Sequence, residues 1–506
     1  MDHHVLWPWD VLHFLYRENR LEKWVYDPPE LASARVKEYW QNVRHLEFFQ
    51  KLELEEEDFA TCIPISWHTD GVKIYRSQKA WVYSYAACTR KGPSLESKLL
   101  FMLFRDCQMV KPDTHDETGL LVAWCMDVLR TGNFPECQYG GAPWPDGSLE
   151  AKRAGMPYAG GWKAAFAAFK ADLEARAMVH KMVRNWASNS ICEHCLASKV
   201  AGLTFGDFTE TAAYLNYQLS HDEFLELNPP DRQSTWIHVK GWTKDRNLDG
   251  IGQHMVASLV CDHYEQMHGP LTLKQLDSLL RLDAWQHYKS FCRAKGKSVA
   301  SCSMQFNLCR FARESWQSYP ELASCYKAAV VKSMLYWVAT FLDERKDAGS
   351  PSSILRADTA YAMAQFQFIQ DTHGAWFDLD TANQAAGAGR RFLVLYQQLA
   401  LFAMRANRKI YRLTPKFHCL LHVTLRLPRE KRNPRFDHLY MEEDYMRHIG
   451  RIASRTHART MGYICLLRYR ALLEMYGLGK YEESKRPHRF LKHSRATQQK
   501  ILLEPC

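Results

Sequence analysis

Residues 63–75, IPISWHTDGVKIY, decide how the rest of the chain is interpreted. The apolar first half is typical of a buried strand, and Asp70 and Gly71 follow it directly. Asp-Gly is a common turn signal, so the simplest interpretation makes Asp70 a turn residue. The alternative makes Asp70 a metal ligand that a core strand presents at its end. The other motifs of the chain bear on this choice.

Further strand and helix patterns follow this segment. Residues 80–88 (AWVYSYAAC) read as a second strand, which a turn at Gly71 would send back antiparallel to the first. Residues 96–130 read as helix with a polar interruption. Residues 161–172 (GWKAAFAAFKAD) suit a strand or a helix, and their alanine content favours a helix by propensity. Residues from about 250 to 412 read as helix almost throughout, so a long helical part is expected.

The composition is that of a globular protein, with 46% apolar and 24% charged residues among 506. The longest apolar run, residues 334–342, is too short to span a bilayer, and the N-terminal residues do not form a signal peptide pattern. The 15 cysteines are scattered, which suits a reduced, intracellular protein better than a disulfide framework. We therefore expect a soluble intracellular protein that does not associate with membranes.

The chain carries a net charge of +10. This balance permits an anionic partner such as nucleic acid, but a plain basic surface explains the charge equally well.

Carboxylates occur in four separated segments that could meet in the fold. They are Asp70, Asp172, the pair Asp245 and Asp249, and the run Glu442, Glu443 and Asp444. Two Mg²⁺ ions about 4 Å apart, held by such oxygens, stabilise the attacking and the leaving oxygen of phosphoryl transfer. Structural interpretations also stand: a turn for the first, a helix N-cap for the second, and an acidic first helical turn for the last. Spacing alone leaves these alternatives open.

A second type of site is indicated by Cys192 and Cys195, which form a close CxxC pair. Two thiolates at this spacing can grip one Zn²⁺ ion. His418 and His422 share one face of a predicted helix and are the best-spaced pair to complete the site. His194, between the cysteines, is expected to point away. Two buried free thiols remain the alternative.

Taken together, these segments resemble transposase-derived proteins related to the Kyakuja–Dileera–Zisupton transposases, a group of mobile elements abundant in dinoflagellate genomes. Four segments carry the matches. The first is residues 63–75 with the aromatic strand after them, and the second is an apolar strand, a helix, a Trp and the CxxC pair in residues 161–199. The third is residues 245–260, and the fourth is a Pro-Lys-x-His helix, an Asn-Pro turn and an acidic helix start in residues 414–457. Their order and spacing across about residues 55–475 carry the resemblance.

The resemblance implies an α/β fold with a ribonuclease-H-like core, a mixed sheet flanked by helices, and a long all-helical insertion. It implies that Asp70, Asp172 and Glu443 bind Mg²⁺ or Mn²⁺ as the catalytic site, and that residues 161–172 form a strand. It also implies DNA as the partner and the nucleus as the location. Cys192 and Cys195 would belong to a structural zinc site.

Two departures from the group's pattern matter. Trp242 stands where the group has an Asp, and Asp245 stands where it has a His. Met1 also lies close to the catalytic core, so an upstream DNA-binding domain is expected to be missing. A degenerate site is therefore compatible with the sequence, and we predict weak or absent catalysis with DNA binding retained through dispersed Lys and Arg side chains.

The expected organisation has five parts. These are a helical segment (1–60), the first part of the core with the CxxC element (61–265), a helical insertion (266–412), C-terminal helices that complete the core (413–480), and a basic tail (481–506). The leading function is a metal-dependent, transposase-like DNA nuclease or strand transferase. The alternatives are a catalytically inactive derivative that binds nucleic acid or acts as a zinc-stabilised interaction protein, and a helical scaffold with structural zinc. A homo-oligomer is compatible with each.

Overall fold

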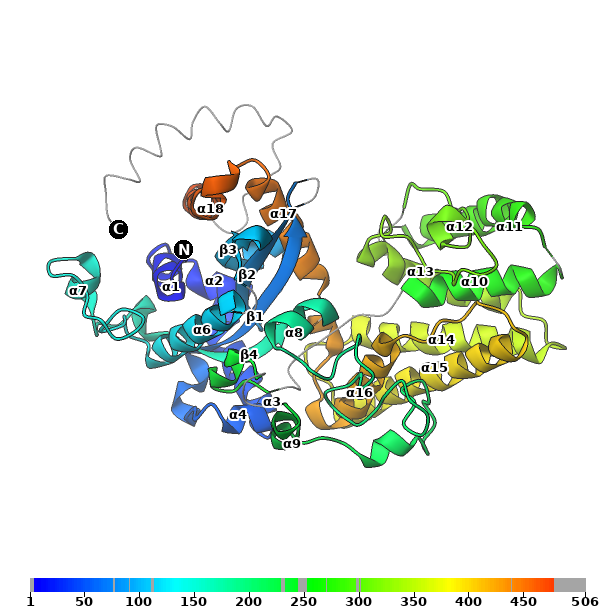
Figure 1. The fold of residues 1–506 in the computed structure, drawn as a ribbon, viewed down its shortest axis with the longest axis horizontal. Coiled ribbons are helices and arrows are strands. Elements are labelled where there is room, and N and C mark those ends of the chain that lie inside the picture. The colour runs from blue at the N-terminus through cyan, green and yellow to red at the C-terminus, as the bar shows by residue number, and fades with distance from the viewer. Residues whose placement is uncertain are drawn as a thin grey trace.

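The computed structural model describes residues 4–75, 78–90, 92–110, 113–228, 233–243, 253–269, 271–296, 300, 302–437 and 439–476. These residues form two lobes, one built around a β-sheet and the other from long helices (Figure 1). Each lobe has its own cluster of buried apolar side chains. The mixed α/β class and the long helical part that the sequence predicts are confirmed.

Four strands form one mixed sheet in the order β3-β2-β1-β4. The strands are β1 (Cys62–Lys73), β2 (Lys79–Ala87), β3 (Lys98–Arg105) and β4 (Lys163–Lys170). The first three strands run antiparallel to one another, whereas β4 lies parallel beside β1. β1 is therefore a central strand with a partner on each side, which explains its nearly continuous apolar sequence.

The turn expected at Gly71 is wrong. β1 continues through Asp70, which pairs with Val82, and the chain reverses only after Lys73. The end of the flexible Lys79 side chain from the neighbouring strand lies over Gly71, where a Cβ would otherwise stand. The local turn preference of Asp-Gly is thus overridden by pairing along both edges of β1.

Two other expectations about secondary structure are corrected. Residues 98–105 form strand β3, not helix, because their apolar run pairs with β2 and is buried. The helix begins later, as α6 (Asp113–Thr131). Residues 163–170 form strand β4, as the resemblance implies and against their helix propensity, since parallel pairing with β1 buries the Ala and Phe side chains.

Helices surround the sheet. They are α1 (Pro8–Arg17), α2 (Leu21–Val25), α3 (Ala32–Val43), α4 (Glu47–Gln50), α5 (Ser94–Ser97), α6, α7 (Leu149–Arg153), α8 (Leu173–Val179), α9 (His221–Glu226), α17 (Tyr440–Ala453) and α18 (Met461–Tyr476). The two last helices come back to the sheet from the far end of the sequence (Figure 1). α17 approaches β1 closely, because a Cβ on Gly450 would lie 2.8 Å from Cγ2 of Val72.

The second lobe is helical. Its helices are α10 (Gln253–Met267), α11 (Leu273–Leu279), α12 (Trp285–Lys295), α13 (Ala328–Glu344), α14 (Pro351–Thr372), α15 (Leu379–Arg405) and α16 (Pro415–Glu430). Its apolar cluster also includes Cys192, Cys195 and Tyr214 from the chain that follows α8. The CxxC loop therefore packs with the helical lobe, although it follows directly on the sheet.

None of the helices in the described part of the chain has both the length and the apolar character needed to cross a bilayer. No disulfide bond joins the cysteines in the part of the chain that the structure describes. Asp245, Asp249 and the basic tail at 481–506 lie outside the described residues.

Candidate metal centre and carboxylate site

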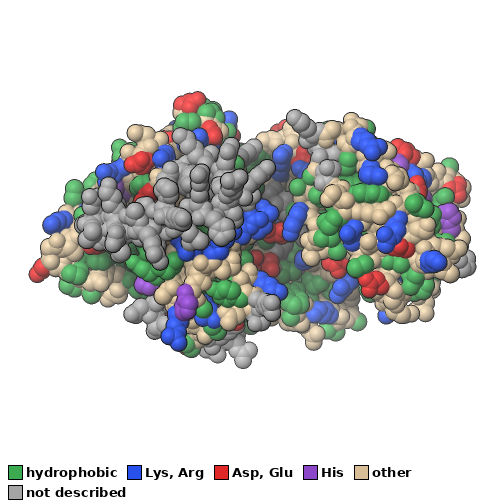
Figure 2. Space-filling model, turned by 90° about the horizontal axis from the view of Figure 1, so that it is seen from above, with side chains coloured by type: hydrophobic (Ala, Val, Ile, Leu, Met, Phe, Trp, Pro, Cys, Tyr) green, Lys and Arg blue, Asp and Glu red, His purple; other side chains and the backbone are tan. Residues whose placement is uncertain are grey.

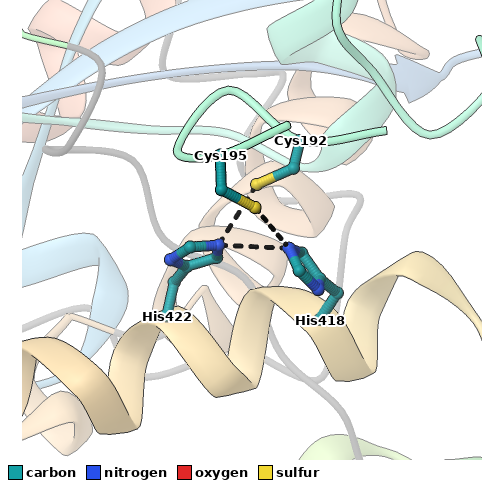
Figure 3. A group of neighbouring side chains, drawn as sticks. All are labelled: Cys192, Cys195, His418 and His422. Atoms are coloured by element: carbon teal, nitrogen blue, oxygen red, sulfur yellow. Dashed lines mark hydrogen bonds between the residues drawn. The ribbon is translucent and has the colours of Figure 1, made fainter. Parts of the chain in front are cut away.

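The structure brings together the four residues that the sequence singles out for zinc. Cys192 and Cys195 lie in the irregular chain after α8, and His418 and His422 lie one turn apart on α16. All four side chains point toward one another (Figure 3). The four residues are buried, with no more than 3% of their surface exposed. This buried Cys2His2 group can hold a metal ion such as zinc.

The distances within the group fit a single ion. Cys192 Sγ lies 3.3 Å from His422 Nε2, and Cys195 Sγ lies 3.2 Å from His418 Nε2. The two Nε2 atoms are 3.1 Å apart, and all four ligand atoms lie within 4.8 Å of one another. A tetrahedral zinc ion, with Zn–S and Zn–N bonds of about 2.3 and 2.0–2.1 Å, separates its ligand atoms by roughly 3.3–3.8 Å. The donor set and the three short separations therefore agree with zinc, and the widest separation would close by about 1 Å around a bound ion.

Backbone and arginine contacts support the cysteine loop. The amide of His194 donates to Cys192 Sγ at 3.2 Å, and the amide of Ala197 donates to Cys195 Sγ at 3.4 Å. Arg184 donates to the carbonyls of Cys192 and Cys195 at 2.6 and 2.8 Å, which fixes the loop conformation.

The histidines are held in a form suited to ligation. His418 Nδ1 lies 3.3 Å from the carbonyl of Phe205, an arrangement that places the proton on Nδ1 and leaves Nε2 free to bind metal. Burial lowers the pKa of His422, with Cys192 acting in the opposite direction, so the ring is neutral near pH 7. His194 is not one of the four ligands: its ring packs 4.7 Å from the ring of His422, and its Nε2 lies 3.5 Å from Glu193.

The first two predicted carboxylates lie at corresponding positions of neighbouring parallel strands, Asp70 near the end of β1 and Asp172 just after the end of β4. His68 of β1 pairs with Lys170 of β4, and Asp70 and Asp172 each follow two residues later. Asp172 caps α8 by accepting a hydrogen bond from the amide of Ala175 at 2.7 Å, so its structural interpretation as an N-cap is correct. Burial, and next the charge of Asp172, raise the pKa of Asp70 to about 7.

The acidic run at the start of α17 divides into three roles. Glu442 is buried, and its Oε1 lies 2.5 Å from Lys98 Nζ and 3.4 Å from Lys170 Nζ. Burial acts to raise the pKa of Glu442, but Lys170 and Lys98 outweigh it and hold the pKa below its usual value. Asp444 accepts a hydrogen bond from Ser94 at 2.5 Å, which ties α17 to α5.

Glu443 is the member of the run that remains exposed at the site. Partial burial raises its pKa, Lys327 and Lys416 lower it, and Asp172 adds to the rise. Glu443 is thus coupled electrostatically to Asp172 and to two lysines of the helical lobe. Lys327 is the N-cap residue of α13, and Lys416 lies in the first turn of α16.

Charged side chains of both signs lie on the surface between the two lobes. Figure 2 shows Lys and Arg side chains gathered around a recess between the two lobes, with acidic side chains inside it. Positive charge around an acidic recess is the arrangement that holds a phosphate backbone next to bound cations.

The three carboxylates are less tightly grouped than the Cys2His2 residues. Among the described residues, the Cys2His2 group is the one set of three or more Cys, His, Asp or Glu side chains close enough to hold an ion, and Asp70, Asp172 and Glu443 do not form a second. Their coupling is pairwise, between Asp70 and Asp172 and between Asp172 and Glu443. Trp242 is buried and stacks on His180 at 5.4 Å, so it serves packing.

Sequence reasoning missed the cations beneath the site. Lys98 and Lys170 are buried, and their shared partner Glu442 is more than 270 positions away from either in the chain. A signal existed, because each lysine belongs to an otherwise apolar strand, where an ionised side chain requires a buried partner. The identity of that partner could not be read from the sequence.

No model of a known protein family matches the chain, and no curated protein matches it at a significant level of sequence similarity.

Proposed function

We propose that the chain is a transposase-like DNA nuclease or strand transferase that uses divalent metal ions, related to the Kyakuja–Dileera–Zisupton transposases. The proposal includes a ribonuclease-H-like core. Its support is the mixed sheet, in which three antiparallel strands are followed by a fourth that lies parallel beside the first. A helical lobe of more than 150 residues separates β4 from α17 in the sequence, as the resemblance implies.

The observation that carries the proposal is the placement of Asp70 and Asp172. Two strands distant in sequence lie parallel and deliver these carboxylates at the same edge of the sheet. The repulsion between them contributes to the raised pKa of Asp70. A divalent cation shared by the two side chains would remove that repulsion and favour both ionised forms.

The residues divide the chemistry among them. Asp70, Asp172 and Glu443 would hold Mg²⁺ or Mn²⁺. When bound, a pair of such ions stabilises the attacking and leaving oxygens of a phosphodiester as water or a DNA 3′ hydroxyl attacks it. Lys327 and Lys416 of the helical lobe would bind the DNA backbone beside the carboxylates. The Cys2His2 group would hold zinc for structure, and the site of action would be the nucleus.

The test is cleavage and strand transfer on duplex DNA with Mg²⁺ or Mn²⁺. We expect weak cleavage by the wild type, in keeping with the altered segment around Trp242, and a loss of that activity of about 100-fold or more in Asp70→Ala, because a misplaced reacting group already costs about this factor. Asp222→Asn is the matched control, since Asp222 is 85% exposed in its side chain and lies on α9. Absence of cleavage by the wild type with either metal would contradict the proposal.

A second function, a catalytically inactive protein that binds nucleic acid or a protein partner, is favoured by one observation. Trp242 is packed into the aromatic core where the resemblance calls for a carboxylate. In that case affinity for duplex DNA should fall linearly with salt on a double logarithmic plot, without cleavage. Binding that persists in Asp70→Ala with no cleavage by the wild type would favour this second function over the first.

A further inference from the structure

A short segment joins the metal-binding helix α16 to the carboxylate-bearing helix α17. It comprises residues 431–437 and is called the interlobe segment here. His422 lies eight residues before Glu430, the end of α16, and Glu443 lies in the first turn of α17. The segment is therefore the direct covalent path between the two candidate sites.

The interlobe segment is fastened to the helical lobe by backbone contacts. The amide of Phe377 donates to the carbonyl of Lys431 at 2.8 Å, and the amide of Asn433 donates to the carbonyl of Ala375 at 3.0 Å. Asn433 is fully buried, and its side-chain amide donates to the carbonyls of Gln370 and Gly374, both at 2.9 Å. These bonds hold the segment against the end of α14.

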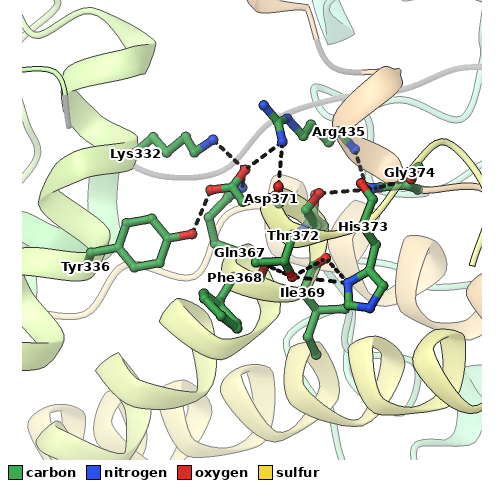
Figure 4. A network of polar contacts seen from close by, with 12 residues as sticks. Lys332, Tyr336, Gln367, Phe368, Ile369, Asp371, Thr372, His373, Gly374 and Arg435 are labelled. Atoms are coloured by element: carbon green, nitrogen blue, oxygen red, sulfur yellow. Dashed lines mark hydrogen bonds and ion pairs between the residues drawn. The ribbon is translucent and has the colours of Figure 1, made fainter. Parts of the chain in front are cut away.

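Charged contacts strengthen the same attachment. Arg435 donates to the carbonyl of Asp371 at 2.8 Å, while the Asp371 carboxylate accepts hydrogen bonds from Lys332 at 2.5 Å and Tyr336 at 2.7 Å (Figure 4). Lys332 and Tyr336 belong to α13, so the segment is linked to two helices of that lobe.

Arg432 fastens the same segment to the sheet lobe. Its guanidinium forms a bidentate ion pair with Asp437, at 3.2 and 3.4 Å, and donates a hydrogen bond to the carbonyl of Cys88 at 3.2 Å. It lies over the ring of Tyr39 of α3, at 5.4 Å, and over the ring of Trp376, at 4.9 Å, and these two rings also contact each other. Only 6% of Arg432 is exposed, so these contacts are dry and mutually dependent.

A second buried ion pair runs from the cysteine loop to the other carboxylate. Glu193 lies between Cys192 and Cys195 and pairs with Arg176 of α8. Both residues are at most 5% exposed. The amide of Arg176 donates to the carbonyl of Asp172 at 2.9 Å, as the first hydrogen bond of that helix.

We propose that Arg432 and Arg176 are positioning residues that couple the Cys2His2 site to Glu443 and Asp172. This inference rests on the proposed function of the carboxylates. Glu193 joins Arg176 of α8 directly to the cysteine loop. Arg432, whose charge Asp437 balances within the interlobe segment, joins that segment to Cys88 and Tyr39 of the sheet lobe. Because breaking these buried contacts strands a charge or its partner away from water, α8 and α17 follow the elements that bind zinc. Filling the Cys2His2 site thus sets the geometry of the carboxylate site.

The experiment uses the full-length, zinc-loaded protein with three measurements. These are zinc content, Mn²⁺ affinity by electron paramagnetic resonance, and hydrogen exchange in residues 172–179 and 439–447. We expect Arg432→Gln to retain zinc, to lose about 10- to 100-fold in Mn²⁺ affinity, and to exchange faster in residues 439–447. Arg432→Lys should fall between it and the wild type, since lysine keeps the charge but not the two-pronged pairing. Arg429→Gln, with a 61% exposed side chain in the last turn of α16, should behave as wild type.

Chelation of zinc from the wild type is the second arm. It should accelerate exchange in both residues 172–179 and 439–447. Unchanged exchange there, with loosening confined to residues 190–197, would overturn the coupling, as would unchanged Mn²⁺ affinity and exchange in Arg432→Gln. If the wild type binds no Mn²⁺ that Asp70→Ala removes, the proposed function fails, and the exchange results alone then decide the coupling.

Discussion

Glu442 and Glu443 are consecutive residues of α17 in opposite environments. Glu442 is 1% exposed and lies between Lys98 and Lys170. Glu443, in contrast, is exposed on the side of the sheet where Asp172 follows β4. The buried acid anchors the helix to two strands, and the next residue faces solvent, where the proposed function assigns it to a cation. Stability and proposed chemistry are therefore carried by different members of one acidic run.

This division predicts that two neighbouring substitutions change the free energy of unfolding by very different amounts. Glu442→Gln should lower the free energy of unfolding by about 3–5 kcal/mol, because it leaves Lys98 and Lys170 buried without a counter-charge. Glu443→Gln should change it by less than about 1 kcal/mol, because the side chain is exposed. Urea unfolding of both variants at pH 7 is the measurement, and equal destabilisation by the two would contradict the assignment of roles.

Local patterns in the sequence were enough for much of the fold and for the Cys2His2 group. β1, β2 and the helical lobe follow from apolar patterning, and CxxC and HxxxH spacings each identify half of the metal-binding group. Two neighbouring thiols and two imidazoles on one helical face have few other uses when buried, which is why the halves could be matched across the chain.

The remaining features depend on contacts between distant segments. β3 was wrongly predicted as helix and β4 was left open, because a short apolar run suits a buried strand or a buried helix until its neighbours are known. The same holds for Glu442: which of three adjacent acids is buried depends on lysines from two separate strands. Arg432 carries no local signal at all, since its partners are an acid five residues on and rings from other elements.

The raised pKa of Asp70 predicts a pH-dependent effect on stability. Its folded-state pKa of about 7 lies above the ordinary value of 3.8, so its contribution is fully present below about pH 4 and is lost as the pH rises through 7. Asp70→Asn, which mimics the protonated acid, should therefore gain stability over the wild type as the pH rises. Between pH 5 and pH 8 we expect a gain of about 1–3 kcal/mol in metal-free buffer. A difference that does not vary with pH would exclude a raised pKa at this position.

Zinc binding by the Cys2His2 group predicts a specific loss on substitution. Purified wild-type protein should contain about one zinc ion per chain, and Cys195→Ser should contain almost none and melt at a lower temperature. Cys107→Ser is the control, because Cys107 is exposed and outside the group. Elemental analysis and thermal unfolding are the two readouts. Equal zinc in all three proteins would remove the assignment.

The close approach of α17 to β1 predicts that one added methyl group lowers the free energy of unfolding. Gly450→Ala should destabilise the protein by about 1–3 kcal/mol, because its Cβ would lie 2.8 Å from Cγ2 of Val72. Val72→Ala in the same chain should recover part of this loss, which a double-mutant cycle measures. Gly387→Ala is the matched control: it lies in α15 with open space around it and should stabilise by up to about 1 kcal/mol. Destabilisation by both substitutions would show that the contact with Val72 is not the cause.

The two halves of the Cys2His2 group are synthesised at different times, because Cys195 and His418 are 223 positions apart in the chain. A ribosome that adds about 5–20 residues per second releases the two thiols roughly 10–45 s before the imidazoles follow. During this interval Cys192 and Cys195 meet the metals and oxidants of the cell as an incomplete dithiol. A chain that is to carry zinc would therefore depend, while it is being synthesised, on how reducing the surroundings are and on which metals compete there.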